Sequence, residues 1–411
     1  MYRMVLRMAW ASLTRRATRS LMVVLMICVS LWGLLLMQGV YDGMTEQMIS
    51  NAIRSDSGHL SLYGHGYRLD PTLVNRINGE RIDQEKLTKL LSRNKNISSW
   101  VLRLGQQGLV ATAHYSRNTV ITGINPEREK IHGRLQRYLV QGEYGFGEKG
   151  KGAIIGFKLA DKLQVSIGNK IILSAQDINS DVTSIALRVT GILKTNNMWL
   201  DETVVFTDIK TARKFLGLKN GITQVSIMIH DEEHLQAIQD DLQKALPSVD
   251  VMRWDEIYPA LMQSRVIMKG FSLVVSLMIF GVAGLGIFGV MLVSVLERIR
   301  EFGIMLAIGT NFGTIRAIIL VESLLMGIAG FLAGAICGGF SLLYFKVYGL
   351  DLTVFSEAFD EFGMDAITHA IIRPDYFITA LTAVVLAILI STYFPLRMLR
   401  KSRPIEVINQ V

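Results

Sequence analysis

Four long stretches of the chain are almost free of charged residues. They cover residues 20–40, 271–296, 317–345 and 376–396, and the only charged residue in them is Glu322. Each is long enough to cross about 30 Å of hydrocarbon as an α-helix. Four buried helices of a soluble protein are the alternative, but a soluble helix normally keeps one polar face. The pattern therefore predicts four transmembrane helices.

The first apolar stretch follows a basic segment, as the apolar part of a signal peptide would. It is longer than the roughly 7–15 residues typical of that part. The residues after it, Gln38-Gly-Val-Tyr-Asp42, also lack a small-x-small cleavage pattern. We therefore expect residues 20–40 to be a retained membrane anchor.

The long region between the first and second stretches has the pattern of a mixed domain. Short alternating or apolar runs predict strands, and two segments predict helices, the second ended by Pro247. The expected strands are 58–63, 119–124, 153–155, 171–173, 185–190, 203–206 and 224–229, and the expected helices are 158–163 and 232–246. This pattern predicts an α+β domain of two subdomains. From Asp255 the chain reads as helical almost without a break into the second stretch, which predicts a rigid stalk.

Basic residues set the expected orientation, since they concentrate on the cytosolic side of membrane helices. They flank the first stretch at Arg3, Arg7, Arg15, Arg16 and Arg19; the second and third at Arg298, Arg300 and Arg316; and the fourth at Arg397, Arg400, Lys401 and Arg403. By contrast, residues 346–375 carry six acids: Asp351, Glu357, Asp360, Glu361, Asp365 and Asp375. We expect a multi-pass membrane protein with both termini and the short second loop in the cytosol.

The predicted layout is a membrane α-helical bundle of four transmembrane helices with a large α+β extracytoplasmic domain between helices 1 and 2. In order, the segments are a cytosolic segment 1–19, helix 20–40, the extracytoplasmic domain and stalk 41–265, helix 271–296, a cytosolic loop 297–316, helix 317–345, an acidic extracytoplasmic loop 346–375, helix 376–396 and a cytosolic tail 397–411.

Composition changes this picture little. Only 19% of the residues are charged, below the roughly 25% of soluble domains. The formal net charge of +8 reflects the membrane orientation, so we expect no nucleic-acid partner. Both cysteines, Cys28 and Cys337, fall inside predicted membrane helices. The extracytoplasmic domain must therefore fold without disulfides.

Two motifs suggest enzymatic chemistry, but neither fits it. Residues 145–152 have the spacing of a phosphate-binding loop, yet Gly152 stands where Ser or Thr would bind Mg²⁺. His230-Asp-Glu-Glu-His234 matches an inverted zinc-protease pattern, which needs both histidines on one helix face. We expect His230 to end a strand, Asp231 to cap a helix and His234 to begin it. No catalytic residue, metal site or cofactor is assigned to this chain.

The loop after the second stretch carries the most specific motif. It reads Glu297-Arg-Ile-Arg-Glu-Phe-Gly-Ile-Met-Leu-Ala-Ile-Gly309. This resembles the E-R-x-x-E-I-G-I-x-x-A-I/L-G pattern of the FtsX/MacB superfamily of ABC transporter permeases (type VII), with Phe302 in place of the more usual Ile. Pro395 to Ile408 is similar to the family's C-terminal pattern, and Ala9 to Arg16 is similar to its N-terminal signature.

The resemblance implies a permease subunit without an ATPase of its own. Such permeases work as dimers, of two copies or of paralogues, with cytosolic ABC ATPase subunits that bind ATP and Mg²⁺. Motion of the stalks would carry the ATP-driven movement outward, which is mechanotransmission. The implied ATPase-coupling residues are Glu297, Arg298, Arg300, Glu301, Phe302, Gly303, Ala307 and Gly309.

Short segments of the extracytoplasmic domain look most like the lipoprotein-releasing, LolC/LolE-like branch. They are Gly58 to Leu60, Ile155 to Ala160, Ile167 to Ile171 and Val189 to Phe206. The resemblance implies lipoprotein cargo and a periplasmic chaperone or adaptor. No proline-rich hook for docking a chaperone is evident. In the family the first two helices face the dimer axis, which suggests a cargo cavity of flexible apolar side chains: Met22, Met26, Leu36, Met37, Val274 and Met278. Ordinary lipid-facing residues would have the same composition.

Two features of the third stretch leave alternatives open. Glu322 is an intramembrane acid, and such a residue is by default a functional candidate. It could take part in coupling, or simply pair or reach toward the interface. Gly330, Gly334 and Gly338 share one face and allow close helix packing, which we expect within the bundle rather than in a dimer contact.

Two functions remain open at this stage. The first is extraction of lipoproteins or other lipidated or hydrophobic cargo from the outer leaflet of the inner membrane. The second is a MacB/FtsX-like permease that drives efflux with an adaptor or activates an extracytoplasmic hydrolase. Both functions would require the lipid bilayer and an ATPase partner subunit.

Overall fold

The chain forms two compact units. The computed structural model describes residues 2–15, 17–77, 84–147, 150–356, 359 and 365–401. The membrane unit comprises Met1–Thr45, Arg265–Leu352 and Ile367–Val411, and the inserted-domain unit comprises Glu46–Ser264 and Thr353–Ala366. Several residues that set the predicted orientation, namely Arg16, Glu357, Asp360, Glu361 and Arg403, lie outside the described part.

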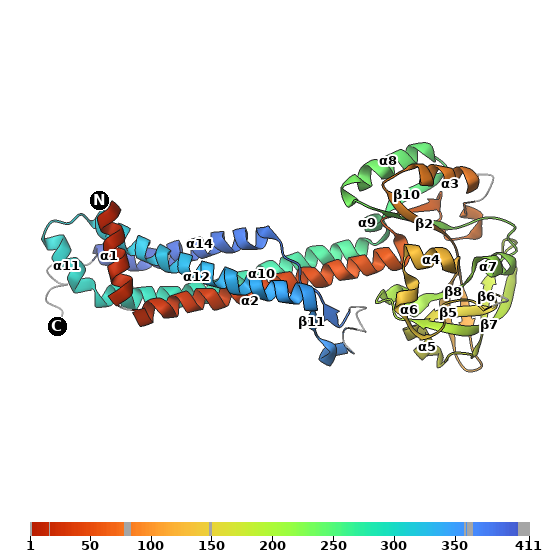
Figure 1. Ribbon diagram of the computed structural model, residues 1–411, viewed down its shortest axis with the longest axis horizontal. Helices are drawn as coiled ribbons and strands as arrows, with labels where there is room; N and C mark the ends of the chain where they lie inside the picture. Colours follow the sequence, from red (N-terminus) through yellow and green to blue (C-terminus); the bar gives the residue numbers. More distant parts are fainter. Residues whose placement is uncertain are drawn as a thin grey trace. The chain divides into compact units, whose positions relative to one another are not determined.

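Helices build the membrane unit, most of them long (Figure 1). They are α1 (Tyr2–Arg15), α2 (Ala17–Ala52), α10 (Pro259–Glu297), α11 (Ile299–Ala307), α12 (Phe312–Tyr348) and α14 (Pro374–Lys401). Within the described ranges, four of these, α2, α10, α12 and α14, are long and apolar enough to cross a membrane. The predicted four-helix membrane bundle is confirmed. The helices are longer than the uncharged stretches because polar residues continue the helix beyond the apolar part.

Small residues of α12 bring it close to α2. A Cβ atom added at Gly334 would lie 2.9 Å from the carbonyl oxygen of Cys28 and 2.9 Å from Cβ of Leu31. Added Cβ atoms at Gly330 and Gly338 would lie 2.7 Å from Ile27 and 2.6 Å from Leu35. Glycine is needed where helices approach this closely. The glycine face therefore packs inside the bundle, as expected from the sequence.

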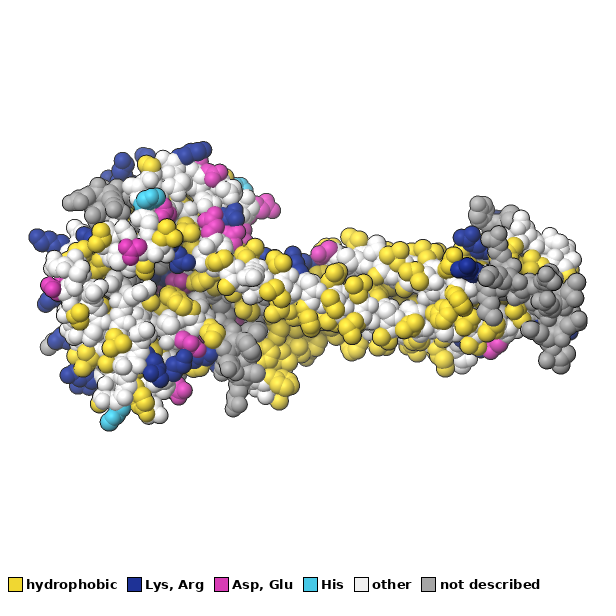
Figure 2. All heavy atoms as spheres, turned by 180° about the vertical axis from the view of Figure 1, so that it is seen from behind, with side chains coloured by type: hydrophobic (Ala, Val, Ile, Leu, Met, Phe, Trp, Pro, Cys, Tyr) yellow, Lys and Arg dark blue, Asp and Glu magenta, His cyan; other side chains and the backbone are white. Residues whose placement is uncertain are grey.

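Apolar side chains also cover the surface of the bundle (Figure 2). The apolar window of α10 is only 11% buried, against 44% for that of α12. Exposed apolar residues on α10 include Leu273, Val274, Leu277 and Met278. Such a surface requires a hydrocarbon environment or another apolar partner.

One mixed sheet forms the frame of the inserted domain. Its strands are β1 (Leu60–Gly64), β2 (Ile97–Ala111), β3 (Ser116–Ile124), β4 (Leu139–Gly142), β5 (Gly152–Gly156), β6 (Lys170–Gln176), β7 (Val182–Leu193), β8 (Val204–Asp208), β9 (Gln224–Ile229) and β10 (Val249–Arg253). Their order is β10-β1-β9-β2-β3-β8-β5-β7-β4, with β6 paired to β2 and β7. The long strand β2 pairs with β9 through Arg103, and with β3 from Leu104 onward. It is therefore shared by both halves of the domain.

Each half has its own core. In the first, α3 (Gln84–Arg93) and α8 (Leu235–Ala245) lie beside β10 (Figure 1). Residues such as Leu91 and Leu242 pack them on β1, β9 and β10. In the second, α5 (Phe157–Leu163) and α7 (Ile209–Phe215) pack on the remaining strands. Two shorter helices are α4 (Pro126–His132) and α6 (Met198–Thr203). The predicted α+β domain with two parts is confirmed.

Most predicted elements of this domain are present, and a few differ. The expected helix 232–246 is a 3-10 turn at Glu232–His234 followed by α8. The expected stalk is broken once, because α9 (Trp254–Ile257) ends at Tyr258 and α10 begins at Pro259. Proline is favoured at the first position of a helix and not in its interior. Strands β2, β4 and β10 and helices α3, α4, α6 and α7 were not predicted.

Candidate functional site

A short helix connects α10 to α12. Arg298 interrupts the α10 helix, and α11 follows directly. Gly309 ends this helix with φ +95°, and its amide donates to the carbonyl of Leu306. The side chain of Asn311 then caps α12 by accepting from the amide of Gly313. The positive φ favours glycine, and the cap favours asparagine, so the local sequence specifies this compact turn.

Arg298 and Glu322 form an ion pair beneath this connection. Arg298 Nη1 lies 2.9 Å from Glu322 Oε2, and the two side chains are only 15% and 9% exposed. The hydroxyl of Ser12 accepts from Arg298 at 2.7 Å and donates to Glu322 at 2.8 Å. Charge-assisted bonds of this kind are roughly twice as strong as neutral ones. The cluster ties together α1, the α10–α12 connection and α12.

A second pair joins the start of α2 to the end of α10. The guanidinium of Arg19 donates to both carboxylate oxygens of Glu297, at 2.8 and 2.6 Å. Both side chains are partly exposed, so this pair contributes little stability alone, about 0–1 kcal/mol. Its bidentate geometry fixes how the two side chains lie relative to each other.

The α11 helix has one buried and one exposed face. Phe302 is 1% exposed and packs in the bundle core, with the Arg298 guanidinium 5.0 Å from its ring centre. Gly303 beside it is also buried. The exposed residues are Arg300, Glu301, Ile304, Ala307, Ile308 and Gly309. The predicted coupling residues therefore split between anchoring α11 and presenting a surface. That surface also includes Ile304 and Ile308, which belong to the sequence motif but were not among the predicted coupling residues.

Another buried ionic cluster lies in the inserted domain, between two stalks. The first stalk is the end of α2 with the π-helical turn Ile53–Ser57, and the second is α9 with the start of α10. Arg103 of β2 is 2% exposed. Its Nε lies 2.6 Å from Oε1 of Glu129, which is completely buried, and its Nη2 lies 3.0 Å from Oε2 of the same residue. Its Nη1 donates to the carbonyl of Asp56, at the end of the first stalk, at 2.5 Å. The hydroxyl of Tyr258, directly before α10, donates to the Asp56 carboxylate.

The electrostatics of this second cluster favour charged Arg103. Burial opposes its charge, but Glu129 and Asp56 outweigh that effect and raise the pKa of Arg103. Burial, helped by the charge of Arg103, lowers the pKa of His132 to about 3. Neutral His132 bonds to the hydroxyls of Ser99 and Ser226, each at 2.9 Å. We call Asp56, Arg103, Glu129 and Tyr258 the stalk junction.

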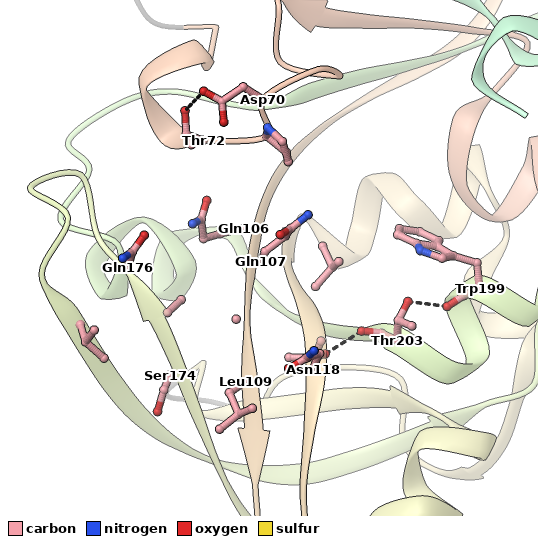
Figure 3. A pocket seen from close by; sticks show the side chains of 16 residues that line it. Asp70, Thr72, Gln106, Gln107, Leu109, Asn118, Ser174, Gln176, Trp199 and Thr203 are labelled. Carbon is pink, nitrogen blue, oxygen red and sulfur yellow. Dashed lines mark hydrogen bonds between the residues drawn. The ribbon is translucent and has the colours of Figure 1, made fainter.

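A polar cavity of about 800 Å³ opens beside the shared strand β2 (Figure 3). Its lining is rich in amides and hydroxyls, among them Gln106, Gln107, Asn118 and Ser174, with Trp199 at one side. A smaller cavity of about 460 Å³ shares Gln107 and Trp199 and reaches the stalk junction. The smaller cavity therefore lies directly beside the stalk junction.

The predicted cargo residues do not line the apolar groove that lies between α10 and α14. Met22, Val274 and Met278 are exposed, and Met26 lies against Gly286 of α10. Leu36 and Met37 are partly buried. This apolar groove has a volume of about 830 Å³ and is lined by Leu277, Phe288, Leu386 and Phe394 among others. A cargo cavity formed together with a second copy of the permease stays a prediction.

The two enzyme-like motifs have the local structure expected from the sequence. His230 follows strand β9, Asp231 caps the turn at Glu232–His234, and the two histidines do not share a helix. Within the described ranges no group of three His, Cys, Asp or Glu residues could hold a metal ion. Gly152 begins strand β5 rather than a long helix, and Glu148 and Lys149 lie outside the described residues.

Comparison with known proteins gives two matches that together cover most of the chain. The profile of the MacB-like periplasmic core domain matches residues 20–245, and that of the FtsX-like permease C-terminal domain matches residues 273–404. The transmembrane protein LolC of the lipoprotein-releasing system of Neisseria meningitidis is 22% identical over 64% of this chain and 66% of its own length.

A macrolide export ATP-binding/permease protein, MacB 1 of Aeromonas hydrophila, is 24% identical over 55% of this chain and 34% of its own length. The matched regions thus span about two thirds or less of these relatives. Among solved structures, the extracellular domain of the transporter YknZ from Gram-positive bacteria matches with a TM-score of 0.33 and 14% identity. That match covers 47% of this chain and 99% of the other.

Proposed function

Because the chain belongs to the FtsX-like permease family and carries a MacB-like periplasmic core domain, we propose that it works by mechanotransmission. In this proposal, a separate ATPase subunit moves the α10–α12 connection, and α2 and α10 carry the movement to the inserted domain. The chain is an ABC transporter permease of the membrane. Its ATPase partner, its place in the bacterial inner membrane and its cytosolic termini are parts of the proposal.

Continuity of α10 is the observation that carries this proposal. The helix runs without a break from Pro259, next to Tyr258 of the stalk junction, to Glu297, which is bound by Arg19. An α-helix rises about 1.5 Å per residue and resists bending over this length, since sharp kinks require a local cause such as proline. Its described interior contains no proline. In this proposal, a displacement at one end of α10 is passed to the other.

The exposed face of α11 is the surface that we assign to the ATPase. It combines apolar Ile304 and Ile308, 46% and 79% exposed, with charged Arg300 and Glu301. An apolar centre with a charged rim is typical of a protein–protein interface. Phe302 and the Arg298–Glu322 pair anchor this helix to the bundle, so a push on α11 reaches α10 and α12.

For cargo we propose lipoproteins or other acylated molecules of the membrane's outer leaflet. Support comes from the similarity to LolC and from the exposed apolar surface of α10, which offers acyl chains or a second permease copy an apolar face. The similarity to MacB 1 favours the second candidate, efflux with an adaptor. A periplasmic chaperone or a paralogous permease subunit would complete either assembly.

The cargo is tested by mass spectrometry of material bound to the purified permease–ATPase complex. We expect acylated peptides in the ATP-free complex and their loss after ATP is added. A complex without any acylated species, but with a stoichiometric extracytoplasmic protein, would exclude lipoprotein extraction and support the adaptor alternative.

A further inference from the structure

A third cavity of the inserted domain is lined by four cationic side chains. It measures about 500 Å³ and lies between α3, α4 and α7. Lys89 comes from α3, Arg128 from α4, and Lys210 and Arg213 from α7. No carboxylate lines it. We propose that this cavity binds a phosphate-bearing anionic ligand.

The four cations lack counter-charges of their own. In the part of the chain that the structure describes, none of them has a carboxylate within salt-bridge distance; nearby Glu127 pairs with Lys130, and Asp208 caps α7. Like charges gathered in one hollow repel one another and create a positive potential. An anion is the complement that would relieve this repulsion.

Arg213 shows the deficit most clearly. Its Nε atom is buried, and within the described residues no acceptor meets it. A buried donor without a partner costs about 1–3 kcal/mol, so such atoms are rare in folded proteins. Burial also lowers the pKa of Arg213, although Asp208 acts in the opposite direction. Arg213 therefore brings to the lining a positive charge that no carboxylate of the described residues meets at salt-bridge distance.

Arg128 is already held in place. Its guanidinium lies 4.6 Å from the ring centre of Trp100, a cation–π contact that uses the face of the group and leaves its N–H edge available. Such a fixed fork suits phosphate, which arginine can bind through two parallel hydrogen bonds.

Neutral donors complete the lining. Oδ1 of Asn125 accepts from the amides of Glu127 and Arg128, so its side-chain NH₂ group remains a donor. Thr88 contributes a hydroxyl to the same cavity. The volume exceeds that of one phosphate group. The cavity therefore fits a diphosphate, or a phosphate attached to a larger group such as a lipid headgroup.

Inorganic pyrophosphate, titrated calorimetrically into the full-length protein in neutral-lipid nanodiscs, is the first probe. We expect saturable binding that weakens about tenfold or more in Arg128→Gln/Arg213→Gln, a change of about 1.4 kcal/mol. The variant Lys89→Gln/Lys210→Gln alters exposed side chains and should weaken binding without affecting folding. The matched control Arg117→Gln/Lys170→Gln removes two exposed charges of the same domain and should leave the affinity within about twofold.

Short-chain phosphatidylglycerol and phosphatidylcholine, added in soluble form, distinguish a lipid source from a soluble phosphate. Competition by phosphatidylglycerol alone identifies an anionic headgroup, and no competition by either identifies a soluble phosphate. The proposal is overturned by absence of saturable pyrophosphate binding, by equal affinity in the Lys89→Gln/Lys210→Gln variant and the control, or by tighter binding of a polyglutamate peptide.

Discussion

Arg298 and Glu322 face each other across the α10–α12 connection, 2.9 Å apart and largely shielded from solvent. They are 24 residues apart in the sequence. Ser12, which bonds to both, lies in α1 near the start of the chain. The pair explains how an acid is tolerated near the end of an apolar helix, because its charge is compensated by a fixed cation.

Removing one partner should therefore destabilise the protein strongly. We expect Glu322→Ala to lower the free energy of unfolding by about 3–5 kcal/mol, because Arg298 would remain buried without its counter-charge. The double variant Arg298→Met/Glu322→Leu should recover much of this loss. Denaturation of the purified protein in detergent measures both.

Glu301 provides the matched control for this pair. It also contacts Arg298, at 3.3 Å, but its side chain is 62% exposed. We expect Glu301→Ala to change the free energy of unfolding by about 0.5 kcal/mol or less. Equal effects of the two alanine variants would contradict the assignment of Glu322 as the structural partner.

The two faces of α11 should separate stability from ATPase binding. Phe302→Ala removes a buried ring and should cost about 3–5 kcal/mol of unfolding free energy. Ile308→Ser alters a side chain that is 79% exposed, and it should leave stability nearly unchanged while weakening capture of the ATPase subunit. Thermal melting and co-purification are the two readouts. Unimpaired capture by Ile308→Ser would count against docking on this face.

Close contact between α2 and α12 should make Gly334 intolerant of larger residues. Gly334→Leu forces a side chain against the backbone of Cys28 and should destabilise the bundle by about 1–3 kcal/mol or more. Gly289 of α10 has no atom within 4 Å of an added Cβ among the described residues. Gly289→Leu is the control, and a similar loss of stability in both variants would argue against helix approach as the cause.

His132 should make the free energy of unfolding depend on pH. Its pKa is lowered to about 3 in the fold, against about 6.5 in an unfolded chain. The unfolded state therefore binds a proton first as the pH falls, and stability decreases between about pH 6.5 and 3, at up to about 1.4 kcal/mol per pH unit. His132→Gln should reduce this slope, measured by denaturation at each pH. Exposed His114 is the control, and a slope unaffected by His132→Gln would contradict the assignment.

Much of the fold follows from the period of apolar residues. The four uncharged stretches predict α2, α10, α12 and α14, because a helix in hydrocarbon needs a long run without charge. Alternating runs such as 224–229 predict strands directly. Strand β2 escaped prediction because its polar residues, such as Gln106 and Gln107, interrupt the apolar pattern. Two of its three partners, β6 and β9, are distant in sequence.

The functional residues were predictable only where a motif or an anomaly marked them. The sequence singled out Glu322 as an intramembrane acid and Arg298 as part of a motif, but their pairing depends on helix packing. Arg103 lies between Leu102 and Leu104 and looks like the exposed side of an amphipathic strand. Its burial follows from α4, the stalks and β2 meeting around it, which no local pattern reveals.

Transmission through α10 is the central claim, and hydrogen exchange at the stalk junction tests it most directly. Val266 is 67% exposed, so Val266→Pro breaks the helix at a cost of about 3 kcal/mol while losing little packing, and Val266→Ala is the control. The readout is exchange of peptides covering residues 53–57 and 254–258, in the complex with the ATPase, with and without an ATP analogue. We predict an ATP-dependent change in the wild type and in Val266→Ala that disappears in Val266→Pro while ATP hydrolysis persists. The same change in Val266→Pro, or none in the wild type, would contradict the account.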